Sequence, residues 1–278
     1  FYIFWCKYRI SKKETFDIVH WHTSRVYPFF WIIPSRKHIV TLHDANMRKY
    51  KDMNTFFTSV FYWSLRLSQR KIKTIFGVSK IAKSELVQYG KFNLSKVAYF
   101  YPGTRFTEIH ARKPPLSDRI LKEPFFVCVS RWQRHKNVHN LVKGFVYAFA
   151  KDSNIPNLIL VGKPVREFDE VEKLIASSGI ENKKIFIMSD LDDEEIAYLY
   201  DRAIANIFPS LLEGFGLCVI ESMARKCPSL VHISGAPAEV ASDTGLTCDM
   251  SDFKDIASNL LEYKKSAFKK NLRIKKEK

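Results

Sequence analysis

The sequence predicts an α/β protein with two domains, each built on a parallel sheet. Three observations lead to this prediction. Short apolar runs of strand length alternate along the chain with stretches of helical periodicity. A break with two prolines, ARKPPLS at Ala111–Ser117, separates two sets of these alternations. The chain has 278 residues, of which 46% are hydrophobic, enough for two domains with cores of their own.

The first set, which gives a domain over residues 1–117, holds four expected strands. They are FDIVHWH (Phe16–His22), HIVTLH (His38–His43), TIFGVS (Thr74–Ser79) and KVAYFY (Lys96–Tyr101). A helical stretch, Thr55–Lys73, lies between the second and the third, so the pattern is that of strands joined by crossover helices.

The second set gives a domain over residues 118–278. Its expected strands are FFVCVS (Phe125–Ser130), NLILVG (Asn157–Gly162), KIFIMS (Lys184–Ser189), AIANIFPS (Ala203–Ser210) and CPSLVHI (Cys227–Ile233). The helical patterns between them are His139–Ala150, Glu167–Ser177, Asp193–Tyr200 and Leu217–Lys226. Strands that alternate with helices in this way are typical of parallel sheets.

The stretch Thr55–Lys73 admits two interpretations. Apolar residues recur at helical spacing, followed by a basic end, and this predicts a core-facing helix with solvated cations. The alternative is an interfacial helix that buries aromatic side chains among lipid headgroups. The basic tail at 264–278 poses the same choice, with a solvated or frayed end expected. The proposed core-facing residues are Phe56, Val60, Trp63 and Leu67, with Phe57, Phe61 and Leu65 widening the face.

Charge is divided unevenly along the chain, whose formal net charge is +16. Residues 1–123 hold 23 Lys and Arg against 8 Asp and Glu, a balance of +15, and residues 124–278 hold 22 against 21, a balance of +1. A basic first half suits an anionic partner, such as lipid headgroups, a phosphorylated acceptor or nucleic acid. Nucleic acid is disfavoured because the basic residues lack an RNA-binding signature.

The cysteines and the hydropathy restrict the compartment. The five cysteines are scattered, without a CxxC pair or a zinc spacing, which indicates reduced thiols in a reducing compartment. No apolar run approaches the roughly 18–20 residues of a membrane span. No leader is visible in a chain that opens at Phe1. A cytoplasmic protein is expected.

Two motifs suggest an anion site with carboxylates beside it. In LLEGFGLCVIES, a glycine turn leads into a helix near Leu217, and a helix N-terminus attracts phosphate. Glu213 and Glu221 flank this turn and suit hydroxyl groups. In VSRWQRHKN, Arg131 and Lys136 follow a strand, where cations can neutralise a diphosphate. Each motif also has a purely structural alternative. The two glutamates could be a helix cap and an exposed helical residue, and VSRWQRHKN could be an ordinary solvated basic loop.

Histidines form a third group at strand ends of the first domain. His20, His22, His43 and Asp44 all follow or end expected strands. A zinc site is disfavoured because no zinc pattern is present and cations dominate the neighbourhood. Polar side chains that face a ligand are the favoured interpretation, and no metal is expected.

The ordered series of motifs resembles the family 4 retaining glycosyltransferases with the GT-B architecture. The pair Glu213–Glu221 matches the E-x7-E signature, and VSRWQRHKN resembles the V-G-R-x(n)-K-N loop. GVSKIAKSEL (Gly77–Leu86) resembles the family's "VS" segment, and DIVHWH and TLHD resemble its histidine-bearing strand ends. YPGT (Tyr101–Thr104) takes the place of its N-G-V/I turn. The resemblance runs from about Phe16 to Ser258 and implies two Rossmann-like domains facing a cleft.

The resemblance also implies a set of roles. Arg131 and Lys136 would hold the donor diphosphate, and Glu221 the donor ribose. Glu213 would contact the transferred sugar, with His43 beside it. Backbone N–H groups of the turn would support the leaving phosphate, which adds Gly214, Phe215, Gly216 and Leu217 to the expected donor site. Such enzymes act without metal or cofactor and retain the anomeric configuration.

Departures from the family pattern leave alternatives open. Ser130 replaces a glycine, and the family's first strand and glycine-rich loop are missing, so the N-terminal domain is expected to be incomplete. The expected function is transfer of a sugar from a nucleotide-diphosphate donor to a glycan or lipid-linked acceptor in cell-surface polysaccharide or glycolipid synthesis. The expected location is the inner face of the plasma membrane, with its anionic surface as a partner. The alternative is a non-catalytic sugar-nucleotide binder or partner subunit.

Overall fold

The chain forms two compact units that are described separately. The structure, a computed structural model, describes residues 16–22, 35–49, 56–163, 170–242 and 245–276. Unit 1 comprises Phe1–Pro102 and the short segment Glu213–Phe215. Unit 2 comprises Gly103–Leu212 and Gly216–Lys278.

Unit 1 contains a parallel sheet with the strand order β1-β2-β3-β4. Its strands are β1 (Phe16–His22), β2 (Ser35–Thr41), β3 (Ile72–Gly77) and β4 (Val97–Tyr99). All described pairings are parallel. The four strands expected in the first half of the sequence are therefore confirmed, with ends shifted by a few residues.

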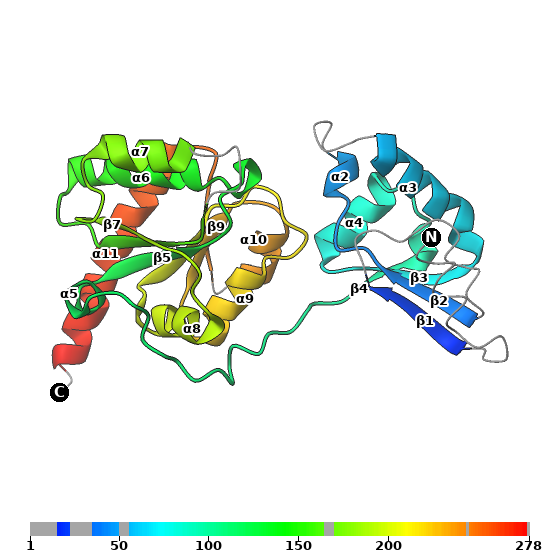
Figure 1. Cartoon of the computed structure of the whole chain (residues 1–278), viewed down its shortest axis with the longest axis horizontal. Helices are drawn as coiled ribbons and strands as arrows, with labels where there is room; N and C mark the ends of the chain where they lie inside the picture. Colours follow the sequence, from blue (N-terminus) through cyan, green and yellow to red (C-terminus); the bar gives the residue numbers. More distant parts are fainter. Residues whose placement is uncertain (1–15, 23–34, 50–55, 164–169, 243–244, 277–278) are drawn as a thin grey trace. The chain divides into compact units, whose positions relative to one another are not determined.

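Helices of unit 1 connect consecutive strands of this sheet. They are α2 (Asn46–Lys49), α3 (Phe56–Leu67), η3 (Ser68–Arg70), α4 (Lys80–Gln88) and η4 (Leu94–Lys96). Tyr62 and Leu65 of α3 and Leu86 of α4 share one hydrophobic cluster with Val40 and Ile75 of the sheet. These two helices therefore cover the same face of the sheet (Figure 1).

The core-facing side of α3 was predicted wrongly. Phe56, Val60, Trp63 and Leu67 are exposed, with exposed fractions of 77%, 39%, 60% and 63%. The buried side carries Thr58 and Tyr62, and it continues with Ser68 of η3. Leu65, expected at the edge of the core face, is buried as predicted, and Phe61 is half-buried. The helix is apolar on two opposite sides, so helical spacing alone did not determine which side meets the sheet. The side chain of Phe57 lies outside the described residues.

Unit 2 contains a parallel sheet with the order β10-β9-β8-β5-β6-β7. Its strands are β5 (Phe125–Val129), β6 (Asn157–Val161), β7 (Ile185–Met188), β8 (Ala205–Phe208), β9 (Ser229–His232) and β10 (Leu246–Cys248). The five strands expected from sequence are confirmed. The expectation did not include β10, which has three residues, two of them exposed, and therefore carries little hydropathy signal.

Helices cover both faces of the sheet in unit 2 (Figure 1). Residues of α6 (Val138–Lys151), α7 (Glu170–Ser178) and α11 (Phe253–Lys276) join one hydrophobic cluster, and residues of α8 (Asp193–Arg202) join another. The basic tail, expected to be solvated or frayed, is helical as far as Lys276 within α11. The remaining helices are α5 (Asp118–Lys122), η5 (Arg134–Lys136), α9 (Leu217–Ala224) and α10 (Ala236–Ala241).

The expected interdomain break, Ala111–Ser117, and the residues just before it pack onto unit 2. Phe106 is buried, and Ile109 and Leu116 are half-buried against the same cluster as α8. Arg112 forms ion pairs with three carboxylates at the start of α8, those of Asp192, Glu194 and Glu195. The boundary between the two compact units, after Pro102, therefore precedes this segment, and the domain ranges 1–117 and 118–278 stay a prediction.

The state of the cysteines and the hydropathy of the helices can be given for the described residues. Cys128, Cys218, Cys227 and Cys248 are free thiols, while Cys6 lies outside the described residues. Among the helices of the described residues, none combines the length and the apolar character that crossing a membrane requires.

Candidate functional site

The strand order of unit 2 reverses between β5 and β8. From β5 the chain adds β6 and β7 on one side of the sheet, whereas β8, β9 and β10 extend the other side. Phe126 of β5 pairs with Ala205 of β8, which places the two strands next to each other. In open parallel sheets, ligands bind outside the carboxyl ends of the strands at such a switch point. The loops after β5 and β8 carry the expected donor site.

The loop after β5 holds the two expected diphosphate ligands. Arg131 is exposed, and Lys136 is half-buried at the end of η5. Asn137 follows in the left-handed conformation, with φ of 59°, and α6 begins at Val138. Asparagine adopts this conformation more readily than most residues, so it suits the sharp change from loop to helix.

Asn137 also ties this loop to two neighbouring loops. Its side chain is 1% exposed and donates hydrogen bonds to the carbonyls of Pro209 (3.2 Å) and Met250 (2.7 Å). The backbone N–H of Leu211 donates to the carbonyl of His135 over 3.1 Å. The segment of Lys136 is therefore held beside the loop after β8. Asn137 was not among the expected site residues, although it ends the motif VSRWQRHKN and that position was its available signal.

The N-terminus of α9 lies on the other side of the switch point. Gly216 precedes it with φ of 103°, a conformation that favours glycine, and no side chain caps the helix. Leu217, its first residue, is exposed. Backbone N–H groups of a first turn without a side-chain cap, together with the helix dipole, attract an anion.

A buried polar cluster positions α9 against the sheet. The Asn206 amide of β8 donates to the hydroxyls of Ser222 (3.3 Å) on α9 and Ser229 (3.2 Å) on β9. The two serine hydroxyls are 2.7 Å apart. These side chains are fully buried, so the bonds fix the direction of α9 relative to β8 and β9.

Glu221 is a half-buried carboxylate on α9. Burial raises its pKa, and the charge of Asp193 raises it further, while a hydrogen bond from the Cys218 thiol opposes the shift. A carboxylate in such a place offers its oxygens to hydroxyl donors, because a second anion there would be repelled.

Unit 1 places His43 and Asp44 just after β2. The His43 ring is exposed and lies 5.5 Å from the His22 ring. Asp44 accepts a hydrogen bond from the backbone N–H of Asn46 (2.9 Å). Burial raises the pKa of Asp44, and the charge of Glu213 adds to this increase.

The segment Glu213–Phe215 belongs to unit 1. The Ser79 hydroxyl donates to the Gly214 carbonyl over 2.8 Å, and the Phe215 ring lies 6.0 Å from that of Tyr101. A Cβ atom on Gly214 would lie 2.8 Å from the His43 carbonyl oxygen, so this position requires glycine. Sequence reasoning did not select Ser79 as a site residue. Its available signal was its place before α4, whose Ala82 N–H it caps.

The expected site residues thus gather in two groups. Unit 1 brings Glu213, Gly214 and Phe215 together with His43. Unit 2 holds, around the β5–β8 switch point, Arg131, Lys136, Gly216, Leu217 and Glu221. Their roles in donor binding and catalysis stay predictions.

Metal ligands are a separate question. Across residues 16–22, 35–49, 56–163, 170–242 and 245–276, no three His, Cys, Asp or Glu side chains are grouped so that they could hold a metal ion. The His20 imidazole instead shares a hydrogen bond of 2.8 Å with the Thr41 hydroxyl.

The second part of the chain matches a known protein family. The family model of group 1 glycosyl transferases matches residues 113–278, more than half of the chain. The chain belongs to this family. The chain is 25% identical over 220 residues to the O-antigen chain mannosyltransferase RfbU of Salmonella typhimurium, covering 79% of this chain and 58% of the relative. It is 26% identical over 215 residues to O-antigen chain mannosyltransferase B of Escherichia coli, covering 72% and 53%. The chain therefore spans about half the length of these relatives.

Solved structures share the fold of this chain. A sucrose-phosphate synthase from Thermosynechococcus elongatus aligns with a TM-score of 0.72 at 18% identity, covering 96% of this chain and 68% of that one. Anabaena HepE, solved in complex with UDP, aligns with a TM-score of 0.66 at 15% identity, covering 81% and 62%. These neighbours are GT-B glycosyltransferases, so the predicted GT-B class with parallel-sheet domains is confirmed. The predicted cleft between the domains stays a prediction.

Proposed function

We propose that this chain transfers a hexose from a nucleotide-diphosphate donor to a glycan or lipid-linked acceptor, with retention of configuration and without metal. One observation carries the proposal. The basic loop after β5 is held against the loop after β8 at the point where the strand order reverses, and this second loop leads along the chain to the uncapped start of α9. That edge of a parallel sheet is where a phosphorylated ligand is expected.

Donor binding is divided among these residues. Arg131 and Lys136 neutralise the diphosphate, with the arginine as a fork and the lysine as a point charge. The backbone N–H groups from Phe215 to Leu217 hold phosphate oxygens, and Gly214 and Gly216 allow close approach. Glu221 accepts hydrogen bonds from the ribose hydroxyls, and Glu213 from the transferred sugar, with His43 beside it. Closure over the donor would exclude water and limit its hydrolysis.

The proposed transfer balances without a cofactor. The bond from the sugar C1 to the phosphate oxygen breaks, and the nucleoside diphosphate leaves with the electron pair. The acceptor oxygen bonds to C1 from the same face, and its proton passes to the departing phosphate. The protein's task is to stabilise the charge that develops on the leaving group, which cations and a helix N-terminus do electrostatically.

The relatives support a proposal for the acceptor and for the place of synthesis. The two O-antigen mannosyltransferases and a capsular polysaccharide glycosyltransferase from Staphylococcus aureus, 27% identical over 147 residues, are named for surface-glycan synthesis. We infer the same class of product here, made on the cytoplasmic side from an acceptor at an anionic membrane surface. Mannose and a UDP donor are the first candidates, because the two O-antigen relatives are named mannosyltransferases and HepE was solved with UDP.

A panel of nucleotide diphosphates and sugar nucleotides in a thermal-shift assay tests donor binding. A ligand at about 100 times its dissociation constant should stabilise the chain by about 2.7 kcal/mol. Lys136→Ala and Glu221→Ala should remove most of this stabilisation while leaving the unliganded melt nearly unchanged. Lys122→Ala, an exposed cation on α5, is the matched control and should keep the full shift. A panel without any stabilising nucleotide would overturn the proposal.

Turnover is measured separately, because a non-catalytic binder would give the same shifts. Transfer to a lipid-linked glycan is followed by product formation, and the anomeric configuration of the new bond by NMR. The activity should persist in excess EDTA. Binding without transfer would favour the non-catalytic partner subunit, and an inverted product would exclude the retaining mechanism.

A further inference from the structure

Helix α3 of unit 1 is apolar on two opposite sides. Its inner side packs Tyr62 and Leu65 into the core. Its outer stripe exposes Val60, Trp63 and Leu67, with Phe56 at the start of the same line. These positions follow the i, i+4, i+7, i+11 spacing of one helical face. A helix that is apolar all round is expected to be covered on both sides, so the outer stripe indicates a docking surface.

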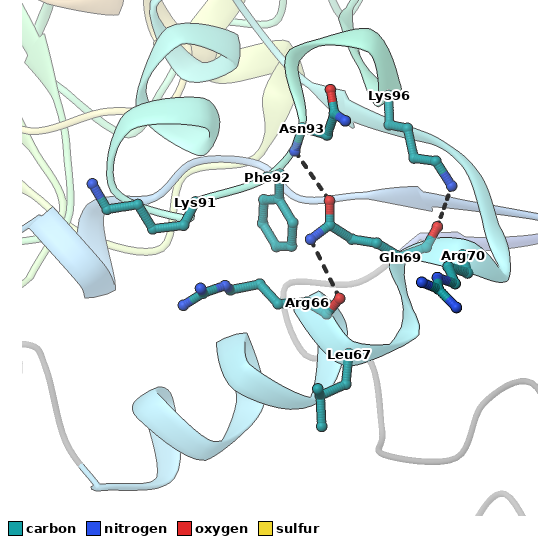
Figure 2. A pocket seen from close by; sticks show the side chains of 8 residues that line it. All are labelled: Arg66, Leu67, Gln69, Arg70, Lys91, Phe92, Asn93 and Lys96. Atoms are coloured by element: carbon teal, nitrogen blue, oxygen red, sulfur yellow. Dashed lines mark hydrogen bonds between the residues drawn. The ribbon is translucent and has the colours of Figure 1, made fainter.

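A basic hollow of about 720 Å³ opens at the end of this stripe (Figure 2). Figure 2 shows the side chains of Arg66 and Lys91 extending toward the same side, with Leu67 at the rim. The hollow lies at the amino ends of β3 and β4. His43 and Asp44 follow the carboxyl end of β2, at the opposite edge of the sheet. The residues that line it are Arg66, Leu67, Gln69, Arg70, Lys91, Phe92, Asn93 and Lys96.

Two of these polar residues hold the corner together. The Gln69 side chain accepts from the Asn93 backbone N–H (3.0 Å) and donates to the Arg66 carbonyl (3.3 Å). The Lys96 ammonium donates to the carbonyls of Gln69 and Ile72. These bonds fix η3 against η4, so the hollow is built before any ligand arrives.

The other cations of the hollow have no carboxylate partner among the described residues. Ion pairs join Glu85 to Lys49 and Asp17 to Arg36, but none joins an acid to Arg66, Arg70 or Lys91. A second hollow of about 470 Å³ shares Arg70 and Lys96 and adds further lining residues, among them Arg36, Lys37, Lys71 and Lys73. The surface beside the apolar stripe is therefore strongly cationic, with little compensation by acids of the described residues.

We propose that the outer stripe of α3 and the cations Arg66, Arg70 and Lys91 form a docking surface for an anionic lipid bilayer. The apolar stripe lies among the acyl chains near the interface, and the arginines and lysine stay at the phosphate level. The helix of 12 residues, about 18 Å long, lies in the plane of the interface. A phosphodiester chain would match the cations but leave Trp63 and Leu67 in water, so a bilayer fits the whole surface better.

This inference names the surface for the membrane partner that the proposed function includes. Its test needs neither donor nor acceptor, so its failure would leave the sugar-nucleotide site untouched. Flotation of the whole chain with vesicles of phosphatidylcholine plus phosphatidylglycerol, and with phosphatidylcholine alone, measures the partition coefficient. We expect much stronger binding to the anionic vesicles and a steep decrease with salt.

Variants assign the binding to this surface. Arg66→Gln with Arg70→Gln should weaken partitioning about fivefold for each lost cation. The matched control, Arg119→Gln with Lys122→Gln on α5 of unit 2, removes the same amount of charge. It should change the partitioning to vesicles little. Trp63→Ala should weaken partitioning at least about tenfold. Its control is Ile233→Ala, an exposed apolar residue of unit 2.

Depth is tested by fluorescence quenching with brominated lipid. Quenching in the wild type that disappears in Trp63→Phe places that ring in the acyl region and supports the proposal. Three results would overturn it: equal binding to neutral vesicles, unchanged binding by both surface variants with normal melts, or a dimer that Trp63→Ala dissociates. The last result would assign the stripe to a second copy of the chain.

Discussion

Helices α6 and α3 hold the same place in the two units but treat their apolar residues differently. Each connects two neighbouring strands, α6 between β5 and β6 and α3 between β2 and β3. The apolar face of α6, which includes Leu141 and Phe145, is buried, and α7 and α11 pack beside the helix (Figure 1). Helix α3 buries one apolar side and exposes another. A crossover helix therefore needs only one apolar side to pack on its sheet. A second, exposed apolar side indicates that the helix also contacts a partner.

The same contrast extends to charge. Unit 2 pairs many of its cations internally, as Arg225 with Asp201 and Lys264 with Asp152 show. In unit 1, no carboxylate of the described residues pairs with Arg66, Arg70 or Lys91. Cations of unit 2 are thus neutralised by acids of the same unit. Unit 1, in contrast, presents cations beside α3 that no carboxylate of the described residues pairs with.

The largest expected effect separates the two helices by stability. Phe145→Ala in α6 should lower the free energy of unfolding by about 3–5 kcal/mol, because it opens a cavity in a fully buried cluster. Trp63→Ala in α3 should change it by less than about 0.5 kcal/mol, because the ring is largely exposed. Urea unfolding measures both. Comparable losses would show that Trp63 is part of a core and would break the comparison.

A smaller effect is expected from the amides that tie loops together in each unit. Asn137→Ala should cost about 1–3 kcal/mol, because two buried carbonyls lose their donor. It should also weaken donor binding through the position of Lys136. Gln69→Ala, which breaks exposed bonds in unit 1, should cost less than about 1 kcal/mol and leave donor binding unchanged. The free energy of unfolding and the donor-induced shift are measured for both, and a reversed order would contradict the assignment.

The smallest effect concerns pH. Burial raises the folded-state pKa of Glu221 in unit 2 and of Asp44 in unit 1. Their contributions to stability are therefore complete below the unfolded pKa and decrease as pH rises through the folded pKa. Glu221→Gln and Asp44→Asn should each flatten the fall of stability above the ordinary values of 4.5 and 3.8. Unfolding curves at a series of pH values measure this, and variant profiles parallel to the wild type would show that burial does not perturb these groups.

Much of the fold was readable because buried parallel strands are continuous apolar runs. The run NLILVG matches the buried strand β6 closely. The run FDIVHWH matches β1 in its bounds, although most residues of β1 are exposed, so the expected burial of this strand was wrong. The miss at β10 has a physical cause, since a short edge strand needs few apolar residues. The orientation of α3 was unreadable because Trp63 and Leu67 repeat as regularly as Tyr62 and Leu65 do.

The candidate site was readable only in part. Positions after strands, such as Arg131 and His43, follow from the pattern that parallel strands present their carboxyl ends together. The position of the switch point cannot be predicted from this pattern, because strand order in the sequence does not indicate that β8 pairs with β5 rather than with β7. Asn137 was not predicted as a site residue, because its structural role depends on hydrogen bonds to carbonyls more than 70 positions away, those of Pro209 and Met250.

The pairing of β5 with β8 has a consequence for how the molecule assembles. Phe126 meets Ala205, 79 positions further along the chain, so this contact closes a long loop at an entropic cost. During synthesis, β5 leaves the ribosome well before its second neighbour exists, and its edge stays open until β8 follows. Contacts this distant slow folding, so the proposed donor-binding edge of unit 2 is expected to form late, after β5, β6 and β7 have paired.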